Sequence, residues 1–167
     1  ACNLIPDARF PKEVLRTEIE FVKTLGDISI KTGAAVKEPA SLLKKYDAVI
    51  VTAGVEKQQK LGIENENLGV EGLEYLRNFR KYKVKGKNVA VIGGGAVAAD
   101  CAMKALELGA AKAEIFTRKN IGDIQLPEHE LRDILKKGIN INAKSRITAI
   151  LKGGGIKIVR LDDKAKD

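Results

Sequence analysis

The stretch VAVIGGGAVAADCAMKALELGAAKAEIFT, residues 89–117, decides the fold of this 167-residue chain. Its first four residues form an apolar run typical of a buried strand, and three glycines follow directly. Residues 96–108 have a helical pattern, and Gly109 stands where a helix would stop. Residues 113–117 then form a second strand-like run. A strand, a turn, a helix and a second strand in this order predict an α/β fold.

The glycines have the pattern Gly93-x-Gly95-x-x-Ala98, directly between the predicted strand and the predicted helix. Gly93 permits a tight turn, Gly95 lets a diphosphate approach the backbone, and Ala98 is small enough for close packing of helix on strand. Free amides and the dipole at the helix start attract phosphate. The pattern therefore predicts a dinucleotide site; the alternative is a glycine-rich turn that only aids packing.

The second strand ends in Arg118 and Lys119, where a site for NADH usually carries a carboxylate that binds the ribose 2′-hydroxyl. Two cations would instead pair with a 2′-phosphate, and a guanidinium group can do so through two hydrogen bonds. We therefore expect NADPH as the cofactor, with NADH as the other possibility. Alternatively, both side chains are ordinary surface cations.

The rest of the chain predicts a Rossmann-like domain with a central parallel sheet, helices on both faces and a β-hairpin extension. The string LKGGGIKI, residues 151–158, carries three glycines without a following helix, so it predicts only the hairpin turn. The expected helices are 12–26, 40–45, 72–82, 96–108 and 128–137; the expected strands are 28–30, 47–54, 89–92, 113–117, 139–142, 147–151 and 156–161; residues 55–69 are expected to form a loop.

Composition excludes several kinds of site. Two cysteines 99 positions apart, Cys2 and Cys101, and a single histidine, His129, make a dithiol centre or a zinc site improbable. No apolar run is long enough to span a membrane, so a reducing cytoplasm is the expected location. The net charge of +8 favours anionic partners. The basic run at 77–87 leaves a second possibility open, a non-enzymatic module that binds nucleic acid or an acidic protein.

Three strings in order, IPDARFPKEVLRTEIEFVKTLG (5–26), YDAVIVTAG (46–54) and NVAVIGGGAVAADCAMKALELGA (88–110), resemble the FAD- and NAD(P)H-dependent module of the glutamate synthase small subunit. The same module occurs in dihydropyrimidine dehydrogenase and in selenate reductase-type proteins, and the first string is most similar to the latter group. The resemblance covers residues 4–161.

The resemblance implies that hydride passes from NADPH to FAD, and that electrons leave through an iron–sulfur domain or subunit. It implies a diphosphate lined by Gly93, Gly94, Gly95, Ala96 and Val97, a 2′-phosphate met by Arg118 and Lys119, and a passage between two cofactor domains at Thr52, Ala53 and Gly54. Residues 1–46 would lead in from a missing FAD domain, 47–161 would form the NAD(P)H-binding core, and 162–167 would be a frayed tail.

Two positions qualify this expectation. Ala96 stands where the family often has Asn or Asp, which bears on how the nicotinamide is oriented. Asp100 matches an acidic family residue that either orders the helix start or approaches the cofactor; a solvated or locally hydrogen-bonded carboxylate is the other interpretation. We expect an enzyme part that is inactive alone, because the FAD site is incomplete.

Overall fold

The structure is a computed structural model that describes residues 5–7, 9–54 and 60–162. The chain divides into two compact units. The sheet unit comprises residues 1–11 and 61–167, and the inserted unit comprises residues 12–60. Cys2, residues 55–59 of the predicted loop and residues 163–167 of the predicted tail lie outside the described residues. The predicted division at residues 46 and 161 stays a prediction.

A parallel sheet of three strands is the centre of the sheet unit, in the order β1 (Asn88–Ile92), β2 (Lys112–Phe116) and β3 (Asn140–Asn142). Ile92 stands opposite Phe116, so β1 and β2 end at the same edge of the sheet. The sequence predicted these strands to within one residue at each end. The α/β class and its parallel sheet are confirmed.

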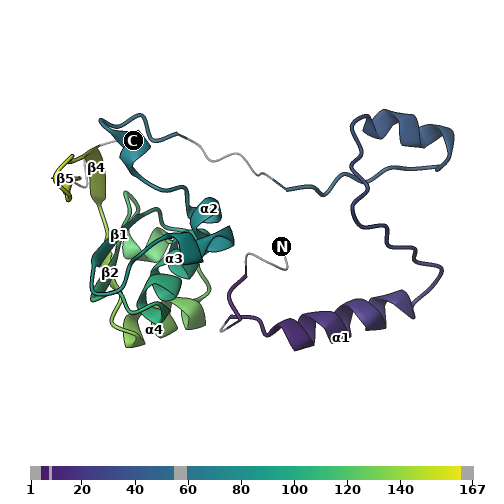
Figure 1. Cartoon of the computed structure of the whole chain (residues 1–167), viewed down its shortest axis with the longest axis horizontal. Helices are drawn as coiled ribbons and strands as arrows, with labels where there is room; N and C mark the ends of the chain where they lie inside the picture. Colours follow the sequence, from purple (N-terminus) through teal and green to yellow (C-terminus); the bar gives the residue numbers. More distant parts are fainter. Residues whose placement is uncertain (1–4, 8, 55–59, 163–167) are drawn as a thin grey trace. The chain divides into compact units, whose positions relative to one another are not determined.

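Two helices, α3 (Ala96–Glu107) and α4 (Glu128–Lys136), pack against the sheet (Figure 1). Ala102 of α3 and Ile134 of α4 share one apolar cluster with Ala113 and Ile115 of β2. Because residues 113 and 115 lie on the same face of a strand, both helices cover that face. The sequence predicted helices on both faces; in the described part of the chain, α3 and α4 share one.

The predicted helix 72–82 is divided into α2 (Gly72–Arg77) and a 3₁₀ turn, Phe79–Lys81. The Asn78 side chain donates to both oxygens of Glu74 at 3.0 and 2.9 Å. Asparagine ends helices readily through such local hydrogen bonds. Tyr75 and Leu76 of α2 pack on Cys101 of α3, and this burial raises the pKa of the Cys101 thiol to about 12.

The predicted hairpin is present as β4 (Ser145–Ile150) and β5 (Ile156–Arg160), paired antiparallel. Gly154 and Gly155 have φ of +92° and +99°, a backbone region that side chains disfavour, which explains the glycines of this turn. Glu64 bridges to Ala149 of β4, just before a 3₁₀ turn at Glu66–Leu68. Another 3₁₀ turn, Ile121–Asp123, precedes α4.

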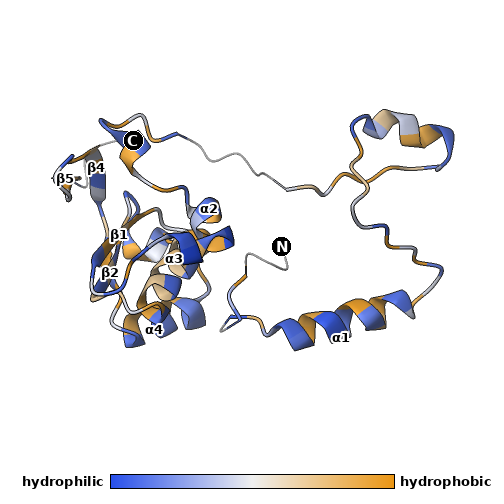
Figure 2. Ribbon diagram, in the orientation of Figure 1, coloured by the Kyte–Doolittle hydropathy of each residue, from blue (hydrophilic) through white to orange (hydrophobic). Residues whose placement is uncertain are grey.

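The inserted unit contains α1 (Lys12–Lys23) and a 3₁₀ helix at Pro39–Lys44, close to the predicted helices. Apolar residues recur along α1 in Figure 2. The predictions of strands at 28–30 and 47–54 are wrong, because neither segment is assigned to a strand. A strand needs a neighbour for its backbone hydrogen bonds, and no described segment pairs with either one. The side chains of Ile50 and Val51 are 85 % and 67 % exposed.

We expect Ile134→Ala to lower the free energy of unfolding by about 2–5 kcal/mol, because it opens a cavity in the apolar cluster that α3 and α4 form with β2. Leu135→Ala is the matched control, since Leu135 is the next residue of α4 and is 52 % exposed. Its effect should stay below about 1 kcal/mol. Urea denaturation of both variants measures the difference, and equal losses would contradict the packing of α4.

Candidate functional site

The turn after β1 lies at the edge of the sheet where β2 also ends. Gly93 has a φ of +144°, and its amide donates to the carbonyl of Phe116 at 3.0 Å. This bond continues the pairing of β1 and β2 one residue beyond the strands. The backbone then passes through Gly94 and Gly95 directly into α3, with Gly95 as the residue that precedes the helix.

Each glycine of the turn has different surroundings. A Cβ on Gly93 would lie 3.3 Å from Cβ of Ala98, so turn and helix are in close contact there. A Cβ on Gly94 would lie 2.6 Å from Oγ1 of Thr117, a distance that forces a shift. A Cβ on Gly95 would meet nothing within 4 Å. The first two glycines therefore permit close packing, while the third faces open space.

The first amides of α3 are available to a ligand. No described residue accepts a hydrogen bond from the N–H groups of Gly95, Ala96 or Val97, and the helix has no side-chain N-cap. Val97 is 42 % exposed. Free amides at a helix N-terminus, together with the helix dipole, favour an anion. The open space beside Gly95 thus has the donors that a diphosphate needs.

The predicted cations lie at the same edge of the sheet. Thr117 is buried, and its amide donates to the carbonyl of Asn142 at 3.0 Å, which extends the pairing of β2 with β3. Arg118 and Lys119 follow as exposed residues. The amide of Lys144 donates to the carbonyl of Lys119 at 3.1 Å and fixes the backbone there. The structure therefore brings the glycine turn and the two cations together; their role in binding stays a prediction.

Thr52, Ala53 and Gly54 belong to the inserted unit and are exposed. Gly54 has a φ of +78°, as expected for a turn. The predicted role of these three residues at a passage between cofactor domains stays a prediction.

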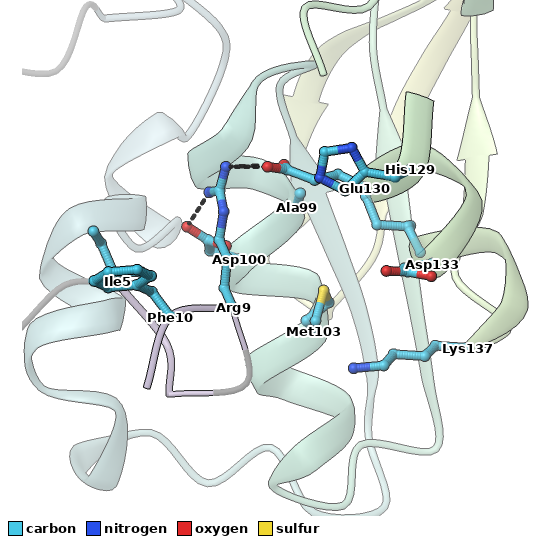
Figure 3. Close-up of a pocket in the computed structure, with 11 residues that line it drawn as sticks. Ile5, Arg9, Phe10, Ala99, Asp100, Met103, His129, Glu130, Asp133 and Lys137 are labelled. Atoms are coloured by element: carbon cyan, nitrogen blue, oxygen red, sulfur yellow. Dashed lines mark hydrogen bonds and ion pairs between the residues drawn. The ribbon is translucent and has the colours of Figure 1, made fainter. Parts of the chain in front are cut away.

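A hollow beside α3 and α4 contains none of the residues predicted to bind the cofactor. It has a volume of about 480 Å³. In Figure 3, Arg9 lies between Asp100 of α3 and Glu130 of α4 and bonds to both. The hollow is also lined by Phe10, Met103, Asp133, Ile134 and Lys137. No local sequence pattern predicts this role for Arg9 and Glu130, because the two residues are 121 positions apart.

Burial raises the pKa of the Asp100 carboxyl, and Arg9 counteracts that rise. Asp100 is 6 % exposed and accepts a hydrogen bond from Arg9, so it is a buried, hydrogen-bonded carboxylate and not a solvated one. His129 is exposed on the first turn of α4. Within residues 5–7, 9–54 and 60–162, no three metal-ligating side chains group together. No helix in those ranges has the length and apolarity needed to cross a bilayer.

A family model described as pyridine nucleotide-disulphide oxidoreductase matches residues 7–166. The chain is 33 % identical to the NADP(+)-dependent formate dehydrogenase subunit beta of Moorella thermoacetica, over 94 % of this chain and 24 % of that protein. It is 26 % identical to the NADPH-Fe(3+) oxidoreductase subunit beta of Geobacter sulfurreducens, over 88 % and 23 %. It is 24 % identical to the glutamate synthase (NADPH) small chain of Escherichia coli, over 95 % and 38 %.

The chain thus spans about a quarter of the length of the first two of these relatives. The resemblance to the glutamate synthase small-subunit module is confirmed by the third. Among solved structures, thioredoxin reductase of T. acidophilum matches 64 % of this chain and 39 % of its own, with 20 % identity and a TM-score of 0.46.

The contact between Gly94 and Thr117 generates a steric prediction. Gly94→Ala should lower the free energy of unfolding by about 1–3 kcal/mol, because its methyl group overlaps Oγ1 of Thr117. Adding Thr117→Ala should restore part of the loss by removing that oxygen. Gly122→Ala is the control, because a Cβ there meets nothing within 4 Å. Thermal denaturation of Gly94→Ala, Thr117→Ala, the double variant and Gly122→Ala measures the effects. Strictly additive losses in the double variant would contradict this contact.

Proposed function

The chain belongs to the pyridine nucleotide-disulphide oxidoreductase family, and from this membership we propose that its sheet unit binds NADPH for a flavin-dependent oxidoreductase. Hydride from the nicotinamide would pass to FAD, and electrons would continue to iron–sulfur centres. The observation that carries the proposal is the open turn after β1, with free amides of α3 beside two cations at one edge of the sheet.

The residues of the turn fit a dinucleotide. Gly95 leaves room for a diphosphate next to the amides of Ala96 and Val97, and the dipole of α3 adds attraction. A bound nicotinamide would supply the hydride chemistry, while this chain binds the cofactor, orients it and excludes water. Ala96 offers no side-chain hydrogen bond to the cofactor, so the orientation depends on the backbone and on the neighbouring units.

Arg118 and Lys119 support NADPH over NADH. Both follow the end of β2, within two residues of Thr117, which is in contact with Gly94. A 2′-phosphate placed there would have two cations near it and no carboxylate in residues 117–119. The names of three relatives all include NADP(+) or NADPH, whereas the other substrates in these names differ. The common nucleotide and the different substrates support a nucleotide-binding segment that is shared by these proteins and combined with different electron acceptors.

We assign the flavin and the iron–sulfur centres to other parts of a larger protein or assembly. The described residues contain one strand–glycine–helix unit, the one at β1 and α3, so they do not provide a second dinucleotide site for FAD. Two of the relatives are named as beta subunits of oxidoreductases. The final acceptor, whether of the glutamate synthase or the selenate reductase type, is set by those other parts.

The alternative function is a basic module that binds nucleic acid or an acidic protein. Its cations are Arg77, Arg80, Lys81, Lys83, Lys85 and Lys87, which precede β1. Lys85 lies beside Gly109, which follows the end of α3 opposite the glycine turn. Lys81 lies 3.9 Å from Glu74, and Glu74 also accepts from Asn78. Mutations in the basic run 77–87 can therefore be made without changing the glycine turn, Arg118 or Lys119.

The binding proposal is tested by calorimetric titration with NADPH. We expect measurable binding to the chain and a loss of at least about tenfold in affinity for Gly95→Ala, whose methyl group enters the space meant for phosphate. The same variant should keep its thermal stability, because nothing lies within 4 Å of that methyl group. No binding by the unmodified chain at millimolar NADPH would overturn the proposal.

The choice of cofactor is tested with Arg118→Ala. We expect affinity for NADPH to fall about tenfold or more, while affinity for NADH stays the same, because only NADPH carries the 2′-phosphate. Lys136→Ala, an exposed cation of α4, is the matched control and should change neither affinity. Competition with heparin distinguishes the alternative function: a basic module would release nucleotide to heparin, and Arg118→Ala would leave its binding nearly unchanged.

A further inference from the structure

A lysine with a left-handed backbone lies just beyond the third strand of the sheet. Lys144 comes two positions after the end of β3 and directly before β4, and its φ is +47°. Within the described ranges, Asn65 is the other non-glycine residue with a positive φ, at +57°. Asparagine adopts this conformation more readily, and the Asn65 side chain also donates to the carbonyl of Ile150 at 2.9 Å. Lysine has no such local advantage, so its conformation at position 144 needs another reason.

The turn that contains Lys144 is bonded to the residues that follow β2. The amide of Lys144 donates to the carbonyl of Lys119 at 3.1 Å. The amide of Ser145 donates to the carbonyl of Thr117 at 2.8 Å. These two hydrogen bonds lie on either side of Arg118, so the turn runs alongside the segment that carries both predicted cations. The position of Lys144 next to that segment is therefore fixed by backbone hydrogen bonds.

Further hydrogen bonds close the same turn from the hairpin. The buried hydroxyl of Ser145 donates to the carbonyl of Ala143 at 3.0 Å and accepts from Nη1 of Arg160 at 2.7 Å. Nη1 of Arg160 also donates to the carbonyl of Ala143 at 3.2 Å. The amide of Leu161 donates to the carbonyl of Lys144 at 2.8 Å. Such surroundings can hold one residue in a strained conformation, and the bonds described here involve only the backbone of Lys144. The turn can therefore form with another side chain at that position.

The turn brings a further cation to the edge of the sheet where the glycine turn opens. Strands β1, β2 and β3 are parallel neighbours, so the glycine turn, the segment 117–119 and Lys144 follow one another along the same edge. Residues 143–146 include Lys144 and Arg146 and no carboxylate. An ammonium group has three donor hydrogens on a flexible stem, so it can bind a phosphate in addition to another partner. A phosphate bound at residues 117–119 would have Lys144 next to it.

We propose that Lys144 is a third cation of the nucleotide site, which binds the 2′-phosphate of NADPH from the side of β3 and adds to the preference for NADPH over NADH. This inference rests on the proposed function, because it takes the dinucleotide to bind at the glycine turn. It adds a specificity-determining residue from a separate strand connection, which no dinucleotide pattern in the sequence indicates. The strained backbone is the cost of keeping a cation where glycine would fit the turn better.

The charge is tested by calorimetric titration of the 167-residue chain with NADPH, NADH and adenosine 2′,5′-bisphosphate, which carries the 2′-phosphate without a nicotinamide. Lys144→Gln should weaken binding of NADPH and of the bisphosphate by about fivefold or more, because a charge-assisted hydrogen bond is lost, and should leave NADH unchanged. Lys144→Arg should keep both affinities within about twofold, because it keeps the charge. Lys152→Gln is the matched control, an exposed lysine in the turn between β4 and β5, and should change none of the three affinities.

The strain is tested by thermal denaturation of Lys144→Gly and Lys144→Ala. Both variants lack the charge, but glycine adopts a positive φ without the steric cost that alanine has. We expect Lys144→Gly to melt about 2–4 °C above Lys144→Ala, and both variants to lose NADPH affinity as Lys144→Gln does. A loss of affinity in the more stable glycine variant would exclude unfolding as its cause. Equal melting temperatures would contradict the strain.

The outcomes separate this inference from the proposed function. Unchanged NADPH affinity in Lys144→Gln, together with a loss in Arg118→Ala, would overturn the role of Lys144 and leave the proposed function standing. Equal losses for NADPH and NADH would show a general effect on the site and would overturn the role in specificity. If Lys144 only paired with another group of the chain, Lys144→Gln would lower the melting temperature and leave all three affinities unchanged. No binding of NADPH by the unmodified chain would contradict both proposals.

Discussion

The candidate site depends on one close approach, that of the backbone at Gly94 to the side chain of Thr117. The two segments meet because β1 and β2 are parallel and in register up to Ile92 and Phe116, and because the Gly93 amide continues the pairing. A side chain at position 94 would separate them. The approach places the start of α3 beside the residues that follow β2, so the free amides and the two cations lie at the same edge of the sheet.

Local sequence signals predicted the parts of the fold that depend on neighbouring residues. Strands β1 and β2, helix α3 and the hairpin each carry their own apolar pattern, and each is present. Residues 28–30 and 47–54 carry strand-like composition, but strand formation depends on a partner segment, which no local pattern specifies. The contacts of Arg9 could not be predicted for the same reason. Its two carboxylate partners lie on helices far along the chain, and the residues around Arg9 do not indicate them.

The distribution of charge matters more than the net value of +8. Cations that follow β2 stand at the edge where the glycine turn opens, whereas the longer basic run precedes β1. The acidic residues Asp100 and Glu130 are held by Arg9 on the flank of α3 and α4. Two basic regions and one ion-paired cluster therefore lie at different places around the sheet.

Cys101 is unsuited to disulphide chemistry, although the family is described as a pyridine nucleotide-disulphide oxidoreductase. A thiol whose pKa is about 12 is almost wholly protonated at neutral pH, and the thiolate is the form that attacks disulphides and reacts with peroxide. Its sulfur also contacts the carbonyl of Gly72, at 3.5 Å. Cys101 thus serves as a small apolar filler between α2 and α3, and any two-electron exchange at this domain must bypass sulfur at that position.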